Sequence, residues 1–368
     1  MAFLAPSGIK PRSLSRRVYA KLFPSDTIFF ADAAPCLHSL IIRAMKFKLS
    51  GPWLSQIRRL SLFYCSIAVS ELLSTLTNMG SLEVLQLGYM ELPNPHINQH
   101  RWPTVTLPRL KRLFISDTVQ TLNIFLGHMA LPLAVCLFAD SRSYEPNIDP
   151  PTSDDFSIFG KSLVAYFQNH SVQKCQANML SCAMESELLI VGVLQVPEVP
   201  FPTHIPRHQF TFNTGPISPG PLPAHALVCT ILRSFASSDL SNITILEIDL
   251  VNSTLDRSDV DLISFLKALV KVEEIRTRSV MLQMLLDITS DGFILLPSLH
   301  TIYFNSSEDL KSDVIMRFLL QRRDSGVPIK TFDLTSCSSS APFQLLFLEE
   351  IEGLVVRWNQ EMRHGIEE

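Results

Sequence analysis

Two pairs of histidines are spaced so that a helix would place both imidazoles on one face. His96 and His100 form one H-x-x-x-H pair, and His204 and His208 form the other. Imidazoles one helical turn apart can chelate zinc. Both pairs lie in proline-containing stretches, neither contains the glutamate of H-E-x-x-H, and no third ligand is evident. We therefore expect solvated loop histidines and no metal site.

The stretch "IFGKS" at 158–162 looks like the end of a phosphate-binding loop. The full motif requires a glycine five residues before Gly160, and that position is Asp155. An aspartate there would repel phosphate, so the stretch predicts a helix interior. The chain also contains no G-x-S-x-G elbow, no G-x-G-x-x-G turn after a strand and no carboxylate pair placed for acid–base work. We expect no catalytic residue, no cofactor and no enzymatic activity, and an enzyme within 131–244 is the alternative.

The seven cysteines are scattered and form no C-x-x-C pair: Cys36, Cys65, Cys136, Cys175, Cys182, Cys229 and Cys337. This pattern indicates neither a disulfide framework nor a zinc site. Reduced, mostly buried thiols are typical of a cytoplasmic or nuclear protein.

Composition narrows the class of protein further. A chain of 368 residues is too long for one ordinary core, which favours several domains or one repeat array. A net charge of -4 gives no case for nucleic acid, and no apolar run approaches the roughly 20 residues of a membrane span. Residues 1–26 carry basic residues without the pattern of a secretory signal, so we expect a loosely ordered leader; an organelle transit peptide is the alternative.

The stretch "IRRLSLFYCSI" at 57–67 is one copy of a repeat. Apolar residues stand at Ile57, Leu60, Leu62 and Ile67, with Cys65 in the ninth place. Related copies begin at 37, 82, 110, 245, 272, 299 and 329. This is the leucine-rich-repeat template at its expected period. The central "LxL" predicts a short strand with inward leucines, and a small thiol in the ninth place can reach backbone groups that the turn leaves unpaired.

Helical periodicity falls between these strands, at 70–79, 258–272 and 308–328. The unit is then strand, turn, helix, and the predicted fold is an α/β leucine-rich-repeat solenoid with a curved parallel sheet on the concave face and helices on the convex face. We expect repeats over 27–130, degenerate repeats with Pro/Gly-rich insertions over 131–244, repeats with a C-terminal capping helix over 245–358, and a frayed tail over 359–368. A break between two solenoid segments is the alternative for the middle region.

The chain resembles the leucine-rich part of F-box-like proteins of basidiomycete fungi. The resemblance covers about residues 22–358 and is carried by "LFPSDTIFFADAAPCLHSLII", "LLSTLTNMGSLEVLQL", "LPRLKRLFIS", "FLLQRRDSGVPIKTFDLTSC" and "FLEEIEGLVVRW". It implies a protein-binding role in which the repeats hold the substrate of a cullin-type (SCF) ubiquitin ligase. The F-box, which would dock the ligase adaptor, is not found in the 36 residues before the first repeat, so the resemblance does not carry over adaptor binding. A repeat-only scaffold or a decayed family member without a ligase role is the alternative.

The residues between the inward leucines should face the hollow of the array. In the first half they include three arginines, two phenylalanines and no acid, and in the second half they include four acids and one arginine. A solvated face with random charges is one interpretation. The other is a groove in which the first half anchors an unknown protein partner, because arginine and aromatic side chains are typical interface anchors. The predicted partner-binding residues on this monomeric chain are Arg43, Arg59, Phe63, Arg112 and Phe114.

Overall fold

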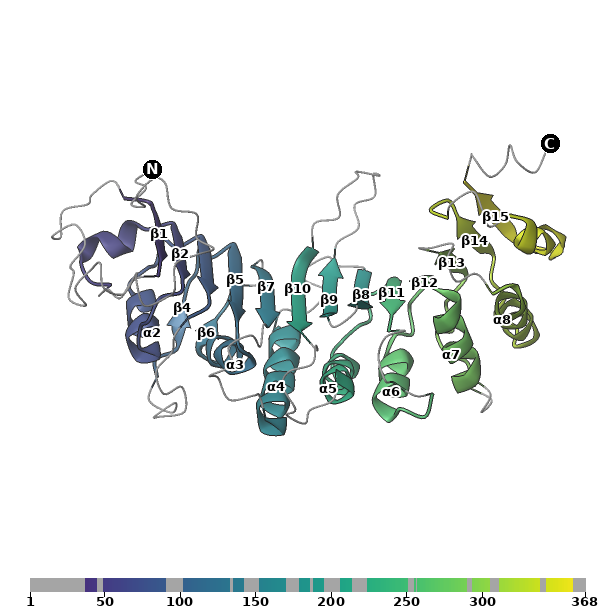
Figure 1. Ribbon diagram of the computed structural model, residues 1–368, viewed down its shortest axis with the longest axis horizontal. Helices are drawn as coiled ribbons and strands as arrows, with labels where there is room; N and C mark the ends of the chain where they lie inside the picture. Colours follow the sequence, from purple (N-terminus) through teal and green to yellow (C-terminus); the bar gives the residue numbers. More distant parts are fainter. Residues whose placement is uncertain are drawn as a thin grey trace. The chain divides into compact units, whose positions relative to one another are not determined.

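The computed structural model describes residues 37–44, 49–90, 102–132, 135–141, 152–169, 179–185, 188–194, 206–213, 224–250, 255, 257–289, 293–304, 311–337 and 342–359. The expected leader lies outside these residues, and so does the expected tail after Asn359. The chain divides into an N-terminal unit, Met1–Tyr166 with His208–Phe212, and a C-terminal unit, Phe167–Arg207 with Asn213–Glu368. Both have a mixed α/β fold (Figure 1). Among the described helices none has the length and apolar character to cross a membrane.

The N-terminal unit is built on a parallel sheet. Its strands follow the order β1 (Ser39–Arg43), β2 (Arg59–Phe63), β3 (Val84–Gly88), β5 (Arg112–Asp117), β7 (Cys136–Ser141) and β10 (Pro206–Asn213). Between strands the chain forms η2 (Pro52–Gln56), α2 (Val69–Thr77), α3 (Val119–His128) and α4 (Ser153–Asn169). Two short strands, β4 (Val105–Thr106) and β6 (Met129–Ala130), pair separately.

Alternate residues of these strands form the core, as the "LxL" pattern predicts. Leu60, Leu62, Leu85 and Leu87 are all fully buried. The parallel register aligns them, with Leu60 opposite Leu85 and Leu62 opposite Leu87. Alternate side chains of a strand form one apolar face, and this face must be covered by another layer. The buried Leu72 and Leu76 of α2 are among the residues of that layer.

Each strand of the first copies ends in the same strained turn. Ala44, Tyr64 and Tyr89 have φ between 53° and 56°, in the left-handed region. Their amides donate to the carbonyls of the next strand at 2.8–2.9 Å. The buried Cys65 thiol then donates to the carbonyls of Phe63 and Ile42 at 3.4 and 3.8 Å. The thiol in the ninth place therefore reaches backbone carbonyls, as expected, although Phe63 O also accepts from Ala44 N and is not left unpaired by the turn. Cys337 makes the same kind of contact with Phe304 O at 3.9 Å.

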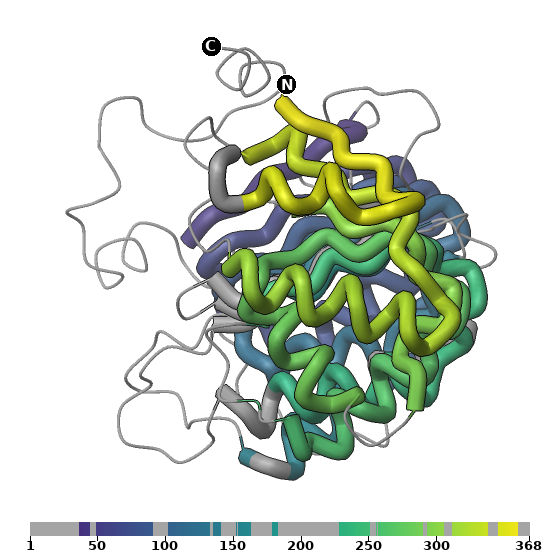
Figure 2. Tube along the Cα trace, turned by 90° about the vertical axis from the view of Figure 1, so that its right-hand side faces the viewer, coloured from purple at the N-terminus to yellow at the C-terminus, as the bar shows by residue number. Residues whose placement is uncertain are grey.

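The C-terminal unit also has a sheet, in the order β9 (Leu188–Leu194), β8 (Met179–Glu185), β11 (Ile245–Asp249), β12 (Glu274–Thr277), β13 (Thr301–Phe304), β14 (Thr331–Leu334) and β15 (Val355–Trp358). Its helices are α5 (Ala224–Ala236), α6 (Val260–Ala268), α7 (Ser279–Thr289) and α8 (Ser312–Asp324), with η4 (Pro342–Glu350) after β14. Figure 2 shows this end of the chain, with α8 and η4 in yellow-green and yellow. The predicted inward residues Ile248, Leu250, Phe332 and Leu334 are buried.

Three features of this unit differ from the sequence-based expectation. The repeat pattern missed β8, and β8 pairs with β9 in antiparallel fashion although the predicted sheet was wholly parallel. Only residues 186 and 187 separate these strands, which is too short for the crossover that a parallel pair needs. The segment in the place of the expected C-terminal capping helix is the 3-10 helix η4, and the strand β15 follows it. The helix expected over 258–272 is shorter: α6 begins at Val260, after the N-cap Asp259 whose carboxylate accepts from Asp261 N, and it ends at Ala268.

Candidate functional site

The outer face of the N-terminal sheet is defined here as the side opposite its buried leucines. The register divides it into three rows that cross the strands. The first row is Ser39, Arg59, Val84, Arg112 and Cys136; the second is Ile41, Ser61, Gln86, Phe114 and Phe138; the third is Arg43, Phe63, Gly88, Ser116 and Asp140. Neighbours in a row are about 4.8 Å apart because that is the spacing of paired strands.

All five residues that the sequence singled out lie on this outer face. Arg43, Arg59 and Arg112 are exposed, while Phe63 and Phe114 are half-buried. The structure sorts them into two groups, however. Arg59 and Arg112 share the first row two strands apart, which places their Cα atoms about 10 Å from each other. Arg43 lies two rows away, about 13 Å along the strand direction.

Arg43 and Phe63 form a packed pair. The Arg43 guanidinium carbon lies 5.4 Å from the centre of the Phe63 ring, within cation–π range. On the adjacent strand the ring covers Gly88, where an added Cβ would stand 2.6 Å from Phe63 Cδ1. Phe63 is therefore held in place by its neighbours. This ring is on the outer face as predicted, but it is only partly exposed to solvent.

Phe114 has an aromatic neighbour that sequence analysis did not find. Its ring centre lies 6.4 Å from that of Phe138 on β7, at an interplanar angle of 32°. Phe138 escaped notice because no full repeat template covers β7. The sequence signal available was the apolar residue at every second position, Val135, Leu137 and Ala139, all of which are buried and leave Phe138 on the opposite side. Phe138 extends the apolar part of the outer face by one strand.

The charges of the outer face are unbalanced. Across the described strands β1, β2, β3 and β5, its three rows contain three arginines and no acid. The carboxylate at the start of β3, Glu83, pairs with Lys111 at 2.7 Å, and this hydrogen bond lowers the pKa of Glu83. The first acid in the rows is Asp140 on β7, which accepts from Ser116 Oγ at 3.1 Å. The face therefore offers positive charge together with aromatic surface.

The corresponding side of the C-terminal sheet is different, because three of its four predicted outward acids contact an arginine. Arg276 contacts Glu274 at 2.7 Å and lies 5.3 Å from the ring centre of Tyr303. Asp333 accepts from Thr335 Oγ1 at 2.6 Å and lies 3.5 Å from Arg357. A further ion pair joins Arg278 to Asp249. These carboxylates already have cationic partners, so this surface carries less uncompensated charge than the N-terminal outer face.

The histidine pairs and the stretch that looks like a phosphate-binding loop form no candidate site among the described residues. His96, His100 and His204 lie outside the described residues, and so does the side chain of His208. The stretch 158–162 lies inside α4, as expected.

Cys229, Asp259 and Asp261 meet at the start of α6 with donor atoms close enough for a metal ion. Burial and the hydrogen bond to Asp259 raise the pKa of the Cys229 thiol to about 12, so it is protonated at neutral pH. Arg233 binds Asp261 with two hydrogen bonds. The cluster is thus a hydrogen-bonded group that already contains its own cation.

Comparison with models of known protein families found no match for this chain, and a search of curated proteins also found none.

Proposed function

We propose that this chain is a leucine-rich-repeat solenoid that binds another protein through the outer face of its N-terminal unit. The observation that carries the proposal is the combination of three exposed arginines with half-buried phenylalanines on one rigid sheet, with no acid among them on β1 to β5. The recurring strand–turn–helix order and the turn thiols Cys65 and Cys337 support the repeat architecture.

The partner should present acidic and apolar side chains together. A carboxylate can accept two hydrogen bonds from one guanidinium, so Arg59 and Arg112 would each take an acidic group. The rings of Phe114 and Phe138 lie beside Arg112 and supply apolar area that arginine lacks. Arg43 already stacks on Phe63, so this pair would act as a preformed unit at the far row.

A charge-reversal experiment tests the proposal. The double variant Arg59→Glu with Arg112→Glu should bind its protein partners at least about 30-fold more weakly, which corresponds to about 2 kcal/mol of binding free energy. The matched control is Arg317→Glu with Arg323→Glu, which makes the same change of charge on exposed positions of α8. Partners would be recovered by crosslinking and affinity purification with each variant. An identical set of partners for both variants would refute the proposed surface.

The narrower proposal is that the module is the substrate-recognition part of an F-box-type ubiquitin ligase receptor. It rests on the resemblance described above. The test is whether a partner lost by the double variant becomes ubiquitinated when the wild-type chain is expressed. We expect that the 368-residue chain by itself does not retain the ligase adaptor. Binding without ubiquitination would favour the alternative, a repeat-only scaffold, and a folded chain that binds no partner would be a decayed family member.

A further inference from the structure

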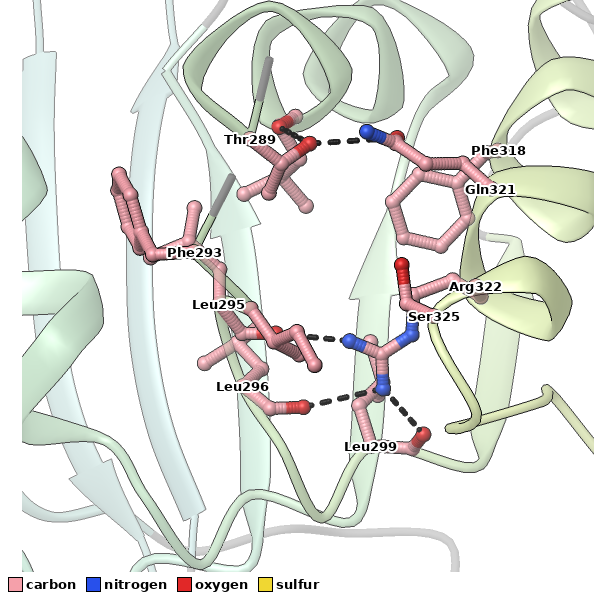
Figure 3. Close-up of a pocket in the computed structure, with 11 residues that line it drawn as sticks. Thr289, Phe293, Leu295, Leu296, Leu299, Phe318, Gln321, Arg322 and Ser325 are labelled. Carbon is pink, nitrogen blue, oxygen red and sulfur yellow. Dashed lines mark hydrogen bonds between the residues drawn. The ribbon is translucent and has the colours of Figure 1, made fainter. Parts of the chain in front are cut away.

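A cavity lies between α7, α8 and the segment 293–299 of the C-terminal unit. Its volume is roughly 220 Å³. Since a water molecule takes about 30 Å³ of liquid, this space has room for a molecule of about seven non-hydrogen atoms or more. Figure 3 shows Phe293 and Leu295 on one side, Phe318 on the other, and Arg322 at one end of the space between them. The walls are mostly apolar and the end is polar.

Arg322 is a buried cation that pairs with no carboxylate of the described residues. Only 6% of the residue is exposed. Its guanidinium donates to the carbonyls of Leu295, Leu296 and Leu299 at 2.7, 3.1 and 2.9 Å (Figure 3). Leu296 adopts a left-handed φ of 49° in this segment. Nε has no hydrogen-bond acceptor, and in the described part of the chain no acid pairs with this arginine.

Carbonyl groups satisfy hydrogen-bond donors but carry no net charge. The buried guanidinium therefore remains uncompensated, and desolvation lowers the pKa of Arg322 to about 10. Buried charges in proteins are normally paired, because an isolated one is costly. An anion in the cavity would supply the missing charge.

The remaining polar groups of the cavity fit the same ligand. Ser325 adds a hydroxyl, and Gln321 adds an amide whose Oε1 accepts from Thr289 Oγ1 at 3.2 Å, at the end of the space away from the Arg322 guanidinium (Figure 3). None of the lining residues is acidic. Apolar side chains of Leu285 and Phe318 face the rest of the space. The site thus combines hydrogen-bond donors at one end with an apolar wall, which is the usual construction of a small-molecule pocket.

We propose that this cavity binds a small monocarboxylate, with the carboxylate at Arg322 and a short aliphatic body between α7 and α8. Hexanoate is a suitable probe because it has a single charge and a short chain. Hexanamide has the same shape without the charge. Isothermal titration of the full chain should show hexanoate binding at least tenfold tighter than hexanamide, because hydrogen bonds to charged groups are stronger than neutral ones.

Variants locate the binding. Arg322→Gln should weaken hexanoate at least tenfold, while Arg323→Gln, which removes a neighbouring exposed cation on the same turn, should leave it unchanged. If Arg322→Gln does not fold, Leu285→Phe fills the cavity from α7 with Arg322 intact and should abolish binding. The proposal is overturned by equal affinity for hexanoate and hexanamide, by loss of binding in Arg323→Gln, or by no binding of hexanoate up to about 10 mM. The last result would mean that the cavity holds solvent alone.

Discussion

Replacing Gly88 by alanine should destabilise the N-terminal unit, although alanine normally suits a strand better than glycine. The added Cβ would stand 2.6 Å from Phe63 Cδ1 and 3.0 Å from Cε1, closer than carbon atoms normally approach. The Phe63 ring cannot move freely, because the Arg43 guanidinium lies on it. Gly88 does not have a positive φ, so backbone strain does not contribute.

The size of the effect follows from two opposing terms. Alanine gives the unfolded chain less conformational freedom than glycine, which should stabilise the folded protein by about 0.4–1 kcal/mol. Overpacking against the ring should cost about 1–3 kcal/mol. We expect a net loss of about 0.5–2 kcal/mol in the free energy of unfolding. In a Phe63→Ala background the ring is absent, so the same Gly88→Ala change should instead stabilise by about 0.4–1 kcal/mol.

Urea denaturation of the four proteins in this double-mutant cycle would measure the effect. Fluorescence of Trp53 and Trp102 would report on the N-terminal unit, to which both residues belong. Gly127→Ala in α3 is the matched control, because nothing lies within 4 Å of its added Cβ and alanine favours a helix. If Gly88→Ala has the same sign with and without Phe63, the ring does not pack on Gly88 and the preformed Arg43–Phe63 pair is wrong.

Three further outcomes are expected. Leu62→Ala truncates a fully buried side chain and should lower the free energy of unfolding by about 2–5 kcal/mol. A loss below about 1 kcal/mol, measured by urea denaturation, would contradict the place of Leu62 in the core. Burial lowers the pKa of His128 below its ordinary 6.5, so the unfolded chain binds more protons there and stability should fall as the pH drops below about 6.5. Denaturation measured between about pH 5 and about pH 8 should show that His128→Gln makes the free energy of unfolding less dependent on pH. An unchanged dependence would mean that His128 is not its source. Burial raises the thiol pKa of Cys182 and Cys229 to about 12 and that of Cys337 to about 11. Iodoacetamide at about pH 8 should therefore modify these thiols only after unfolding. Peptide mapping by mass spectrometry would show whether the folded protein is modified at these positions.

The sequence alone determined the strands of the clear repeats and which of their residues point inward. This was possible because the side-chain direction in a strand has a period of two, and the period depends on the local chain alone. Leu60 and Leu62 are buried for that reason, and Arg59 and Phe63 therefore fall on the opposite side. The end of α8 is equally local, since Gly326 follows the helix and takes a φ of 77° that few other residues adopt.

Other features depended on strands outside the clear repeats. The template itself aligns Arg43 with Phe63, because both hold the same place in successive copies, and the register agrees. The template did not contain the pairing of β7 with β5, which places Phe138 beside Phe114. In the C-terminal sheet, Asp249, Glu274 and Asp333 each contact an arginine, so three of the four outward acids that the sequence predicts are compensated.

Arg322 shows the difference most clearly. The last turn of a helix commonly carries exposed cations near its negative end, and Arg323, the arginine next to it in α8, is one. Only the packing of the segment 293–299 against α8 decides that Arg322 is buried and bound to three carbonyls while Arg323 stays in solvent. Local periodicity fixes the direction of a side chain, but its electrostatic surroundings are set by segments that are distant in sequence.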